Sequence, residues 1–193
     1  YSWSASREAD KVTLTGFVPD ESTAKANLAA ARGLGSALRI EDQQKIAFGA
    51  PAGFAALTGA MIADLGRLSA GKVALDDTRF CVEGTASSPE AFLALRAAAA
   101  AAPPVGFSRV DCALNPPVVS PYIWSAEKNA AGAVSLSGFY PSEAAKNEIA
   151  GLASRAFPEA GAITDRTQPA SGEPPAFLAQ VGRALSELAR LRS

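Results

Sequence analysis

The stretch Val12–Pro19 reads VTLTGFVP, and Val134–Pro141 repeats it as VSLSGFYP. Apolar and polar residues alternate along both stretches up to a glycine, which is the period of a half-buried β-strand. A looser echo, FCVEG, occupies Phe80–Gly84 between the two, and Tyr1–Ala5 (YSWSA) returns as Tyr122–Ala126 (YIWSA). Because the same stretches recur in the same order, the sequence indicates an internal duplication.

Hydrophobic periodicity predicts the order strand, strand, helix, strand around each repeated strand. The proline and acidic residues that follow the strand, Pro19–Ser22 in the first copy, are typical of a helix start. The elements expected in the first copy are strands near 1–5, 11–18, 38–40, 71–75, 78–84 and 107–114, and helices near 20–34, 52–68 and 88–102. Those expected in the second copy are strands near 122–127, 133–140 and 162–165, and helices at 142–156 and 175–192.

The expected fold class is α/β, in the form of an α+β sandwich whose helices pack on one face of a mixed sheet. We expect two units built from the strand-strand-helix-strand repeat. The first spans 1–117, with halves at about 1–50 and 70–115 joined by a helix at about 52–68. The second spans 118–193 and matches about two thirds of the first, so we expect it to be incomplete at its C-terminus and the chain to be a piece of a longer protein.

The repeated element resembles the core of the BON domain, in which an alternating strand ends in glycine and a short turn leads into an alanine-rich helix. Val12–Ala30 and Val134–Ala153 fit this pattern, and Phe80–Ala102 fits it more loosely. The middle copy departs from the family at Thr85–Ser88 (TASS), which replaces the FVP and FYP turns. Tandem BON units ahead of a peptidoglycan-binding domain are typical of some OmpA-family envelope proteins, and this chain is similar to such a region.

The resemblance implies a periplasmic location at the bacterial cell envelope, associated with the outer or inner membrane. It implies contact with a phospholipid surface or with another envelope protein. Peptidoglycan binding is expected only through a domain outside these residues. The resemblance brings no catalytic residues and no cofactor, because the family has no defined active site.

Composition narrows the function classes further. The 193 residues contain no histidine, which excludes a Ser-His-Asp triad, a Cys-His pair and any histidine-based zinc or iron site. The net charge of −1 argues against nucleic-acid binding, which depends on clustered Lys and Arg. The longest apolar run, Ala97–Val105, contains two prolines and is too short to span a membrane. We therefore expect no enzyme, no metal and no cofactor; an enzyme with lysine or carboxylate groups in a cleft is the remote alternative.

Two aromatic pairs, Tyr1 with Trp3 and Tyr122 with Trp124, are the candidate surface-contact residues. Their spacing puts both members of a pair on one side of a strand. Trp and Tyr suit membrane interfaces and protein contacts because one end of each ring is polar. Such rings also cover the edge of a small hydrophobic core, and the sequence favours this structural role over surface contact.

Glycines Gly16, Gly84 and Gly138 occupy one position of the three repeats. Glycine in a strand often marks a close backbone approach. We expect the helix alanines to press against these glycines, with ligand contact as the alternative.

The chain has two cysteines, Cys81 and Cys112, and an oxidising periplasm would permit a bond between them. Matching the repeats places Cys81 level with Thr13 on the polar face of its strand. Cys112 shares the parity of Val110 and Leu114, which indicates the helix-covered face. Opposite faces would prevent the bond on geometric grounds.

Adjacent carboxylates occur at Glu41–Asp42 and Asp76–Asp77. No loop around them has the ligand pattern of a calcium site, so we interpret them as solvated strand ends.

The main functional hypothesis is therefore a non-enzymatic periplasmic binding or spacer module that contacts phospholipid. The alternative is a protein-interaction scaffold that uses an exposed sheet face or edge strand. An aromatic patch surrounded by Lys and Arg would favour lipid, and an apolar patch without basic residues would favour a protein partner.

Overall fold

The chain is described from a computed structural model that defines residues 1–160 and 162–191. It divides into two compact units, Tyr1–Asn115 and Pro116–Ser193, here called unit 1 and unit 2. Helices and mixed sheets make this an α+β fold, as the sequence predicts. None of the described helices is both long enough and apolar enough to cross a bilayer.

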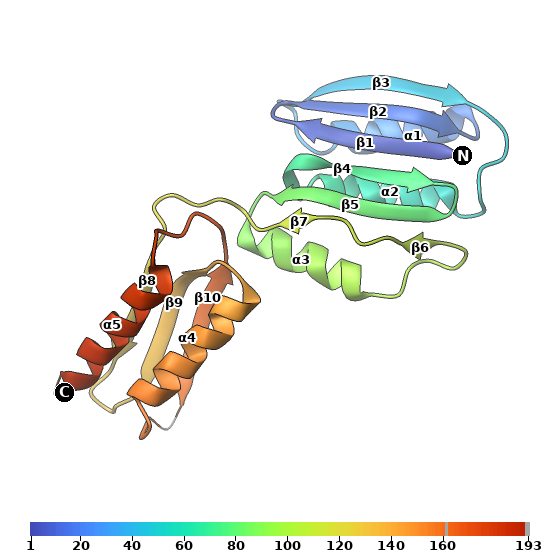
Figure 1. Cartoon of the computed structure of the whole chain (residues 1–193). Coiled ribbons are helices and arrows are strands. Elements are labelled where there is room, and N and C mark those ends of the chain that lie inside the picture. Colours follow the sequence, from blue (N-terminus) through green and yellow to red (C-terminus); the bar gives the residue numbers. More distant parts are fainter. Residues whose placement is uncertain (161, 192–193) are drawn as a thin grey trace. The chain divides into compact units, whose positions relative to one another are not determined.

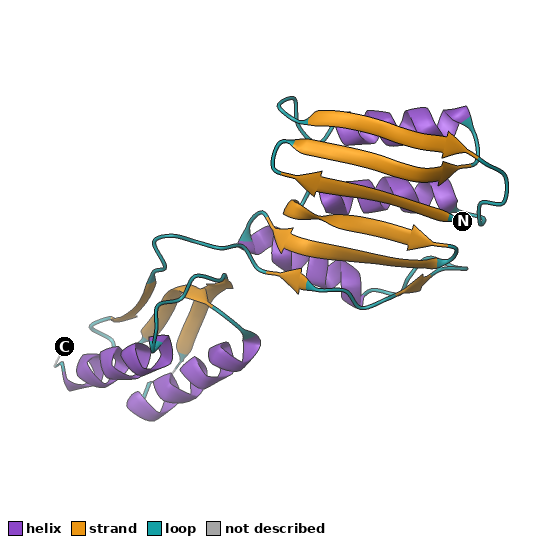
Figure 2. Ribbon diagram, turned by 45° about the horizontal axis from the view of Figure 1, so that its top comes forward, coloured by secondary structure: helices purple, strands orange, loops and turns teal. Residues whose placement is uncertain are grey.

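Unit 1 is one mixed sheet covered on one face by helices (Figures 1 and 2). The strand order is β3-β2-β1-β4-β5-β6, and β7 also pairs with β5. Its elements are β1 (Ser2–Glu8), β2 (Lys11–Val18), α1 (Glu21–Arg32), β3 (Arg39–Ile46), α2 (Phe54–Leu65), β4 (Leu68–Asp76), β5 (Arg79–Ala86), α3 (Pro89–Ala100), β6 (Ser108–Arg109) and β7 (Leu114–Asn115).

The pairing within unit 1 runs in two similar halves. β1 pairs antiparallel with β2, and β2 pairs parallel with β3 after the crossover through α1. β4 pairs antiparallel with β5, and β5 pairs parallel with β6 and β7 after the crossover through α3. The halves meet where β1 and β4 pair antiparallel, so β1 is covered on both edges.

Unit 2 has a three-stranded sheet in the order β10-β9-β8. Its elements are β8 (Trp124–Lys128), β9 (Val134–Tyr140), α4 (Glu143–Ala156), β10 (Ile163–Pro169) and α5 (Phe177–Arg190). β8 pairs antiparallel with β9, and β9 pairs parallel with β10, which is the pairing of β1, β2 and β3. Among the residues that the structure describes, no strand pairs with the second edge of β8.

The crossover helices begin where the sequence offers a side-chain cap. Asp20, Ser88 and Ser142 are the N-cap residues of α1, α3 and α4, and each accepts a hydrogen bond from the backbone N–H three residues further on. Such a bond satisfies an N–H that has no partner within the helix. The start of each crossover helix is therefore determined locally.

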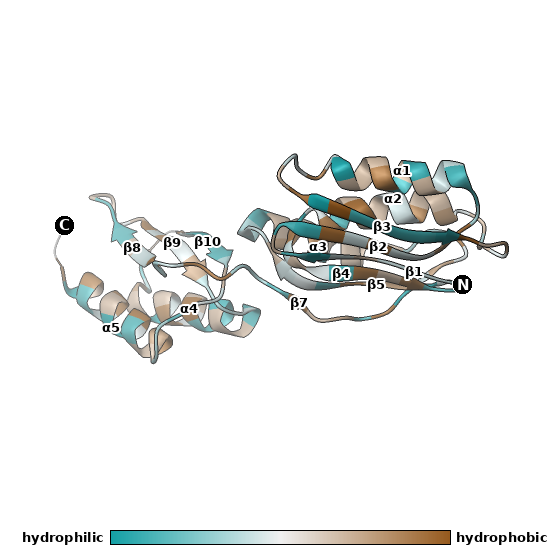
Figure 3. Ribbon diagram, turned by 90° about the horizontal axis from the view of Figure 1, so that it is seen from above, coloured by the Kyte–Doolittle hydropathy of each residue, from teal (hydrophilic) through white to brown (hydrophobic). Residues whose placement is uncertain are grey.

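Several predicted elements differ from the structure, among them the strand expected at 162–165, which extends to Pro169 as β10. The helix expected to run to residue 68 ends at Leu65, since Gly66 is its C-cap, and Leu68 is instead a fully buried residue of β4. The strand expected at 38–40 extends to Ile46, because pairing with β2 continues along the largely hydrophilic β3 (Figure 3). The strand expected at 107–114 is interrupted, and only β6 and β7 pair with β5.

Candidate contact surface

Trp3 is a core residue. Its side chain is 1% exposed, its ring lies edge-on to Phe54 of α2, and its indole Nε1 donates a hydrogen bond to Gln44 Oε1 at 3.0 Å. A side chain in this position cannot reach a partner, so Trp3 is not a surface-contact residue, and the favoured interpretation of its ring as part of the core is the correct one. It is buried because α2 covers the helix-side face of β1 and β4 pairs with the outer edge of β1.

Tyr1 and Tyr122 hold equivalent positions in the two units. Each is half-buried, and each lies edge-on to the phenylalanine that begins α2 or α5, Phe54 or Phe177, with ring centroids 5.3 Å apart. Their hydroxyls donate to the carbonyl oxygens of Ala47 and Ala170 at 3.1 and 3.3 Å. Burial raises the pKa of the Tyr122 hydroxyl well above its ordinary value. Both rings therefore tie the strand to the segment that leads into the helix.

Trp124 is half-buried, and its indole Nε1 is buried without an acceptor. In unit 1 the residue opposite Gly16 on the parallel strand is Gln44, which supplies the acceptor for Trp3. In unit 2 the residue opposite Gly138 is Thr167, whose hydroxyl donates to Asp165 at 2.6 Å. The shorter side chain leaves the second tryptophan without its hydrogen bond.

The three repeat glycines permit close contact between strands. Gly16, Gly84 and Gly138 have φ values of +98°, +136° and +97°, a region that favours glycine. A Cβ atom at each would lie 2.2 to 2.4 Å from a carbonyl oxygen of the neighbouring strand or its leading residue, namely Ser2, Ala70 or Ile123. The expectation that helix alanines press against them is therefore wrong, because the adjacent backbone occupies that place.

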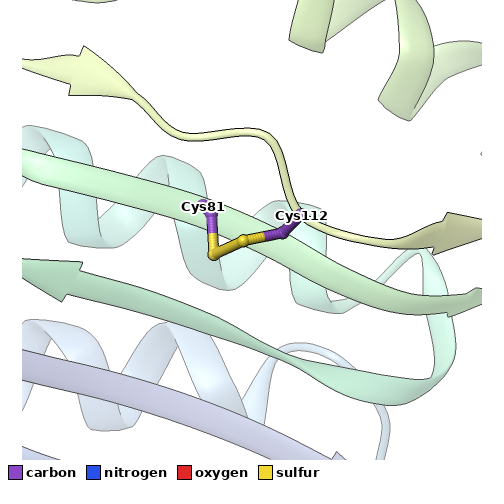
Figure 4. Close-up of a disulfide and its surroundings, with 2 residues drawn as sticks. All are labelled: Cys81 and Cys112. Atoms are coloured by element: carbon purple, nitrogen blue, oxygen red, sulfur yellow. A yellow bond between two sulfur atoms is a disulfide. The ribbon is translucent and has the colours of Figure 1, made fainter.

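Cys81 and Cys112 form a disulfide, with Cα atoms 6.0 Å apart (Figure 4). Cys81 follows the buried Phe80 on β5, so it lies on the face of the sheet that the helices leave open. A bonded partner must lie on that same face. The placement of Cys112 on the helix-covered face is consequently wrong.

A shift in strand register explains this error. On β5, Phe80 pairs with Arg109 and Gly84 pairs with Leu114. The partner segment therefore has one more residue than β5 between these two pairs. An extra residue reverses the alternation of faces along a strand. Leu114 packs toward the core while Cys112 lies on the open face.

Exposed apolar residues lie at one end of unit 1, and we call this group the apolar tip. It consists of Phe17, Ile46 and Phe48, which are 40%, 62% and 97% exposed. Ile46 pairs in register with Val18, next to Phe17, and the Ala47 N–H donates to the Val18 carbonyl oxygen at 2.9 Å. These contacts bring the three side chains to the same end of the sheet.

Tyr1 forms the base of the apolar tip. Its ring centroid is 6.2 Å from that of Phe17, and its hydroxyl is bonded to Ala47, next to Phe48. Phe48 stands in the loop between β3 and α2, beside Gly49. The sequence pattern did not predict the tip. Apolar residues in a connection that contains glycine and proline could have indicated it, because connections lie at the surface and their apolar side chains are therefore exposed.

The charges near the apolar tip are mostly acidic. Asp20 and Asp77 lie close to Tyr1: the charge of Asp20 adds to burial in raising the pKa of the Tyr1 phenol, and the Asp77 N–H donates to the Tyr1 carbonyl oxygen at 2.9 Å. Asp76 precedes Asp77 at the end of β4. The cations of this end include Lys45, opposite Phe17 in the register of β2 and β3, and the Tyr1 ammonium, which forms an ion pair with Asp77.

The acidic pairs do not form a metal site. Glu41 lies 3.7 Å from the ammonium of Lys11, and Asp42 accepts hydrogen bonds from the backbone and side chain of Gln44. Within residues 1–160 and 162–191, no group of three or more Cys, Asp and Glu side chains could hold a metal ion.

The open face of unit 1 has a cavity of about 460 Å³ over Gly71 and Gly84. Glu8, Glu83 and Lys72 are among its lining residues. Arg7 lines it as well, and two carboxylates with two cations do not form the converging acidic set expected of acid–base chemistry.

No family model matches this chain, and no curated protein matches it.

Proposed function

We propose that the chain is a non-enzymatic, protein-binding module of the bacterial cell envelope, and that the apolar tip is its contact surface. The observation that carries the proposal is the joint exposure of Phe17, Ile46 and Phe48 at one end of unit 1. Exposed apolar groups gathered in one place mark interaction sites more often than scattered ones do. Phe48 in particular is 97% exposed, so burial in the core of unit 1 does not account for an aromatic residue there.

The surrounding charge favours a protein over a bilayer. Anionic lipid surfaces attract clusters of Lys and Arg, whereas the side chains whose charges act on Tyr1 are the carboxylates of Asp20, Asp76 and Asp77, of which Asp77 is paired with the Tyr1 ammonium. A partner with an apolar recess and a basic rim suits both the aromatic side chains and the carboxylates. Contact with phospholipid, which the BON resemblance implies, is the competing outcome.

The disulfide supports the proposed location. Bonds of this kind persist in oxidising compartments such as the bacterial periplasm. Cys81 and Cys112 are both partly accessible, so the reductants of a reducing compartment would reach the disulfide and reduce it. The similarity of the repeats to BON units supports the same compartment.

The test is site-specific photo-crosslinking in an envelope fraction, with a benzoylphenylalanine in place of Phe48. The matched control carries it in place of Val105, which is 100% exposed in another connection of unit 1. We expect a discrete protein adduct from position 48 that is absent from position 105 and is lost when Ile46→Ser is added.

Vesicle co-sedimentation separates the two kinds of partner. Neutral phosphatidylcholine vesicles and vesicles that also contain phosphatidylglycerol serve as probes. We expect no pelleting with either. If the unchanged chain pellets and the Phe48→Ser variant does not, the partner of the tip is a phospholipid surface and not a protein. If positions 48 and 105 give equal adducts in the crosslinking experiment, the tip is not a contact site.

A further inference from the structure

β3 of unit 1 and β10 of unit 2 are equivalent edge strands. Each pairs parallel with the repeated strand beside it, β2 or β9, and no strand among the described residues pairs with its outer edge. The chain continues from both strands into a helix, so this edge is a feature of the repeated motif itself. A free strand edge presents unpaired N–H and C=O groups that can pair with another chain.

The pairing of β3 with β2 shows which N–H groups of β3 point outward. At the start of β3 the Arg39 N–H donates to the Asp10 carbonyl oxygen at 2.7 Å. Just after β3 the Ala47 N–H donates to the Val18 carbonyl oxygen at 2.9 Å. The register between these two bonds has no shift, and N–H groups alternate in direction along a strand, so the even-numbered residues of β3 direct theirs outward. Gln44 is one of these residues.

Asp42 accepts the outward N–H of Gln44. The Gln44 N–H donates to Asp42 Oδ1 at 3.1 Å, and Gln44 Nε2 donates to the same oxygen at 3.0 Å. A side-chain oxygen that bonds the backbone two residues further on is a recurrent local motif of Asp and Asn. On a free edge, this bond takes a donor that an incoming strand would use.

Unit 2 repeats the arrangement. The Ala170 N–H donates to the Tyr140 carbonyl oxygen at 3.0 Å, so the odd-numbered residues of β10 direct their N–H groups outward. Thr167 is one of them, and its N–H donates to Asp165 Oδ1 at 2.9 Å. The Thr167 hydroxyl donates to the same oxygen at 2.6 Å. In both units, one carboxylate oxygen therefore accepts the backbone and the side chain of the residue two positions further on.

The two aspartates hold the same place in the repeat. Asp42 pairs with Leu14 of β2. Asp165 pairs with Leu136 of β9, and both leucines are buried. Each carboxylate consequently lies on the helix-covered side of its strand, but it is exposed because the edge is free. A strand added at the edge would remove water from this charge as well as compete for the N–H, and both effects oppose pairing.

We propose that Asp42 and Asp165 keep two copies of the chain from pairing through these edges, because each carboxylate occupies an outward N–H that the second copy would need. Two copies present the same edge to each other, so an edge with all its donors free is self-complementary. This proposal does not depend on the proposed function.

Other residues of the two edges act in the same direction. Pro169 stands at an outward position of β10 and has no N–H, which is the usual place of proline in a sheet. β3 carries charged residues on its other face, and its hydrophilic character is visible in Figure 3. These residues are Arg39, Glu41 and Lys45. Charged side chains along an edge also discourage pairing with another chain.

Hydrogen exchange of the ¹⁵N-labelled full chain tests the captured N–H groups without any substitution. We expect the amides of Gln44 and Thr167 to exchange at least about tenfold more slowly than those of Ile40 and Ile163, which also point outward. Equal exchange at the four amides would mean that the carboxylates do not hold these N–H groups, and the proposal would be wrong.

Analytical ultracentrifugation of two paired variants tests the consequence. Asp42→Ala with Asp165→Ala removes the acceptor, whereas Asp42→Asn with Asp165→Asn removes the charge and retains an acceptor oxygen. We expect the alanine pair to self-associate at least about tenfold more tightly than the asparagine pair, which should behave as the unchanged chain does. A monomeric alanine pair, or equal association of both pairs, overturns the proposal.

Glu41→Ala is the matched control on β3. Glu41 is odd-numbered, so its N–H points to β2, and the substitution removes a carboxylate without freeing an outward donor. We expect no self-association of this variant; association equal to that of the alanine pair would assign the effect to lost charge.

Amide exchange of the associated alanine pair locates the contact. We expect new protection at the β3 and β10 amides while the amides of β2 and β9 stay protected, which also shows that the variant is folded. Protection confined to other strands contradicts the proposed edges. If the double substitution unfolds unit 1, Asp165→Ala against Asp165→Asn makes the same comparison in unit 2 alone.

Discussion

The indole Nε1 of Trp3 donates a hydrogen bond to Gln44 Oε1 at 3.0 Å, which joins β1 to β3 across the strand between them. The same oxygen accepts from Asn27 Nδ2 at 2.9 Å, and Thr58 Oγ1 donates to Asn27 Oδ1 at 3.0 Å. Asn27 and Thr58 are buried, so this network lies inside the core of unit 1. A buried polar group is costly once its partner is lost.

We expect Gln44→Ala to lower the free energy of unfolding of unit 1 by about 2 kcal/mol, because two buried donors lose their acceptor. Urea unfolding of the full chain measures the change. The neighbour Gln43 is exposed, and Gln43→Ala should change stability by less than about 0.5 kcal/mol. Equal effects of the two substitutions would show that the network contributes nothing.

Gly16→Ala is expected to destabilise unit 1 by more than about 2 kcal/mol, because φ is +98° and the new Cβ would lie 2.4 Å from the Ser2 carbonyl oxygen. Gly59 in α2 is the matched control, since no heavy atom lies within 4 Å of a Cβ built there. Gly59→Ala should be neutral or stabilise by up to about 1 kcal/mol. Thermal unfolding of both variants compares them, and a harmless Gly16→Ala would mean that β1 does not approach this closely.

Replacing both cysteines, Cys81→Ser with Cys112→Ser, should lower the stability of unit 1 by about 3–4 kcal/mol, because the bond closes a loop across a sequence separation of 31 residues. Unit 2 contains neither cysteine, so its own transition should not move. Labelling with iodoacetamide gives the direct check. We expect no labelling of the native chain until reductant is added; labelling without reductant would contradict the bond.

Asp20 should make unit 1 less stable in acid. Its carboxylate accepts from the Thr23 N–H at 2.7 Å, and this bond lowers the pKa of Asp20 below its ordinary value. A carboxyl group with a lower pKa in the folded chain stabilises the fold above its unfolded pKa, and that contribution is lost as pH falls through the folded pKa. The loss is therefore expected below about pH 4.

Asp20→Asn tests this pH dependence, because asparagine caps a helix without a titrating group. Urea unfolding at neutral pH and at about pH 3 should show a smaller loss on acidification for the variant than for the unchanged chain. Identical losses in the two chains would assign the acid sensitivity to other carboxylates.

Much of the fold could be predicted because it depends on neighbours in the sequence. Alternation along Val12–Val18 and Val134–Tyr140 predicts β2 and β9, and the acidic or hydroxyl caps predict the starts of α1 and α4. The polar β3 was underestimated because its strand conformation is stabilised by β2, and its own sequence carries a weak signal.

The candidate site was less predictable. The tyrosine and tryptophan pairs recur clearly in the sequence, but a recurring aromatic residue is equally compatible with a core and a surface. Trp3 is buried because β4, more than sixty residues away, closes the edge of β1. The side chains that are exposed, Ile46 and Phe48, carry no periodic pattern.

The sequence by itself determined the strand-strand-helix-strand order, because alternation and capping act over a few residues of the chain. Only the tertiary structure decided that Cys81 meets Cys112, since one extra residue opposite β5 shifts the register and reverses the faces. It also decided that Trp3 is enclosed, whereas Trp124 lies on a strand whose second edge has no partner among the described residues. Both outcomes depend on which strands pair and in what register, and this is set by packing between segments that are distant in the chain.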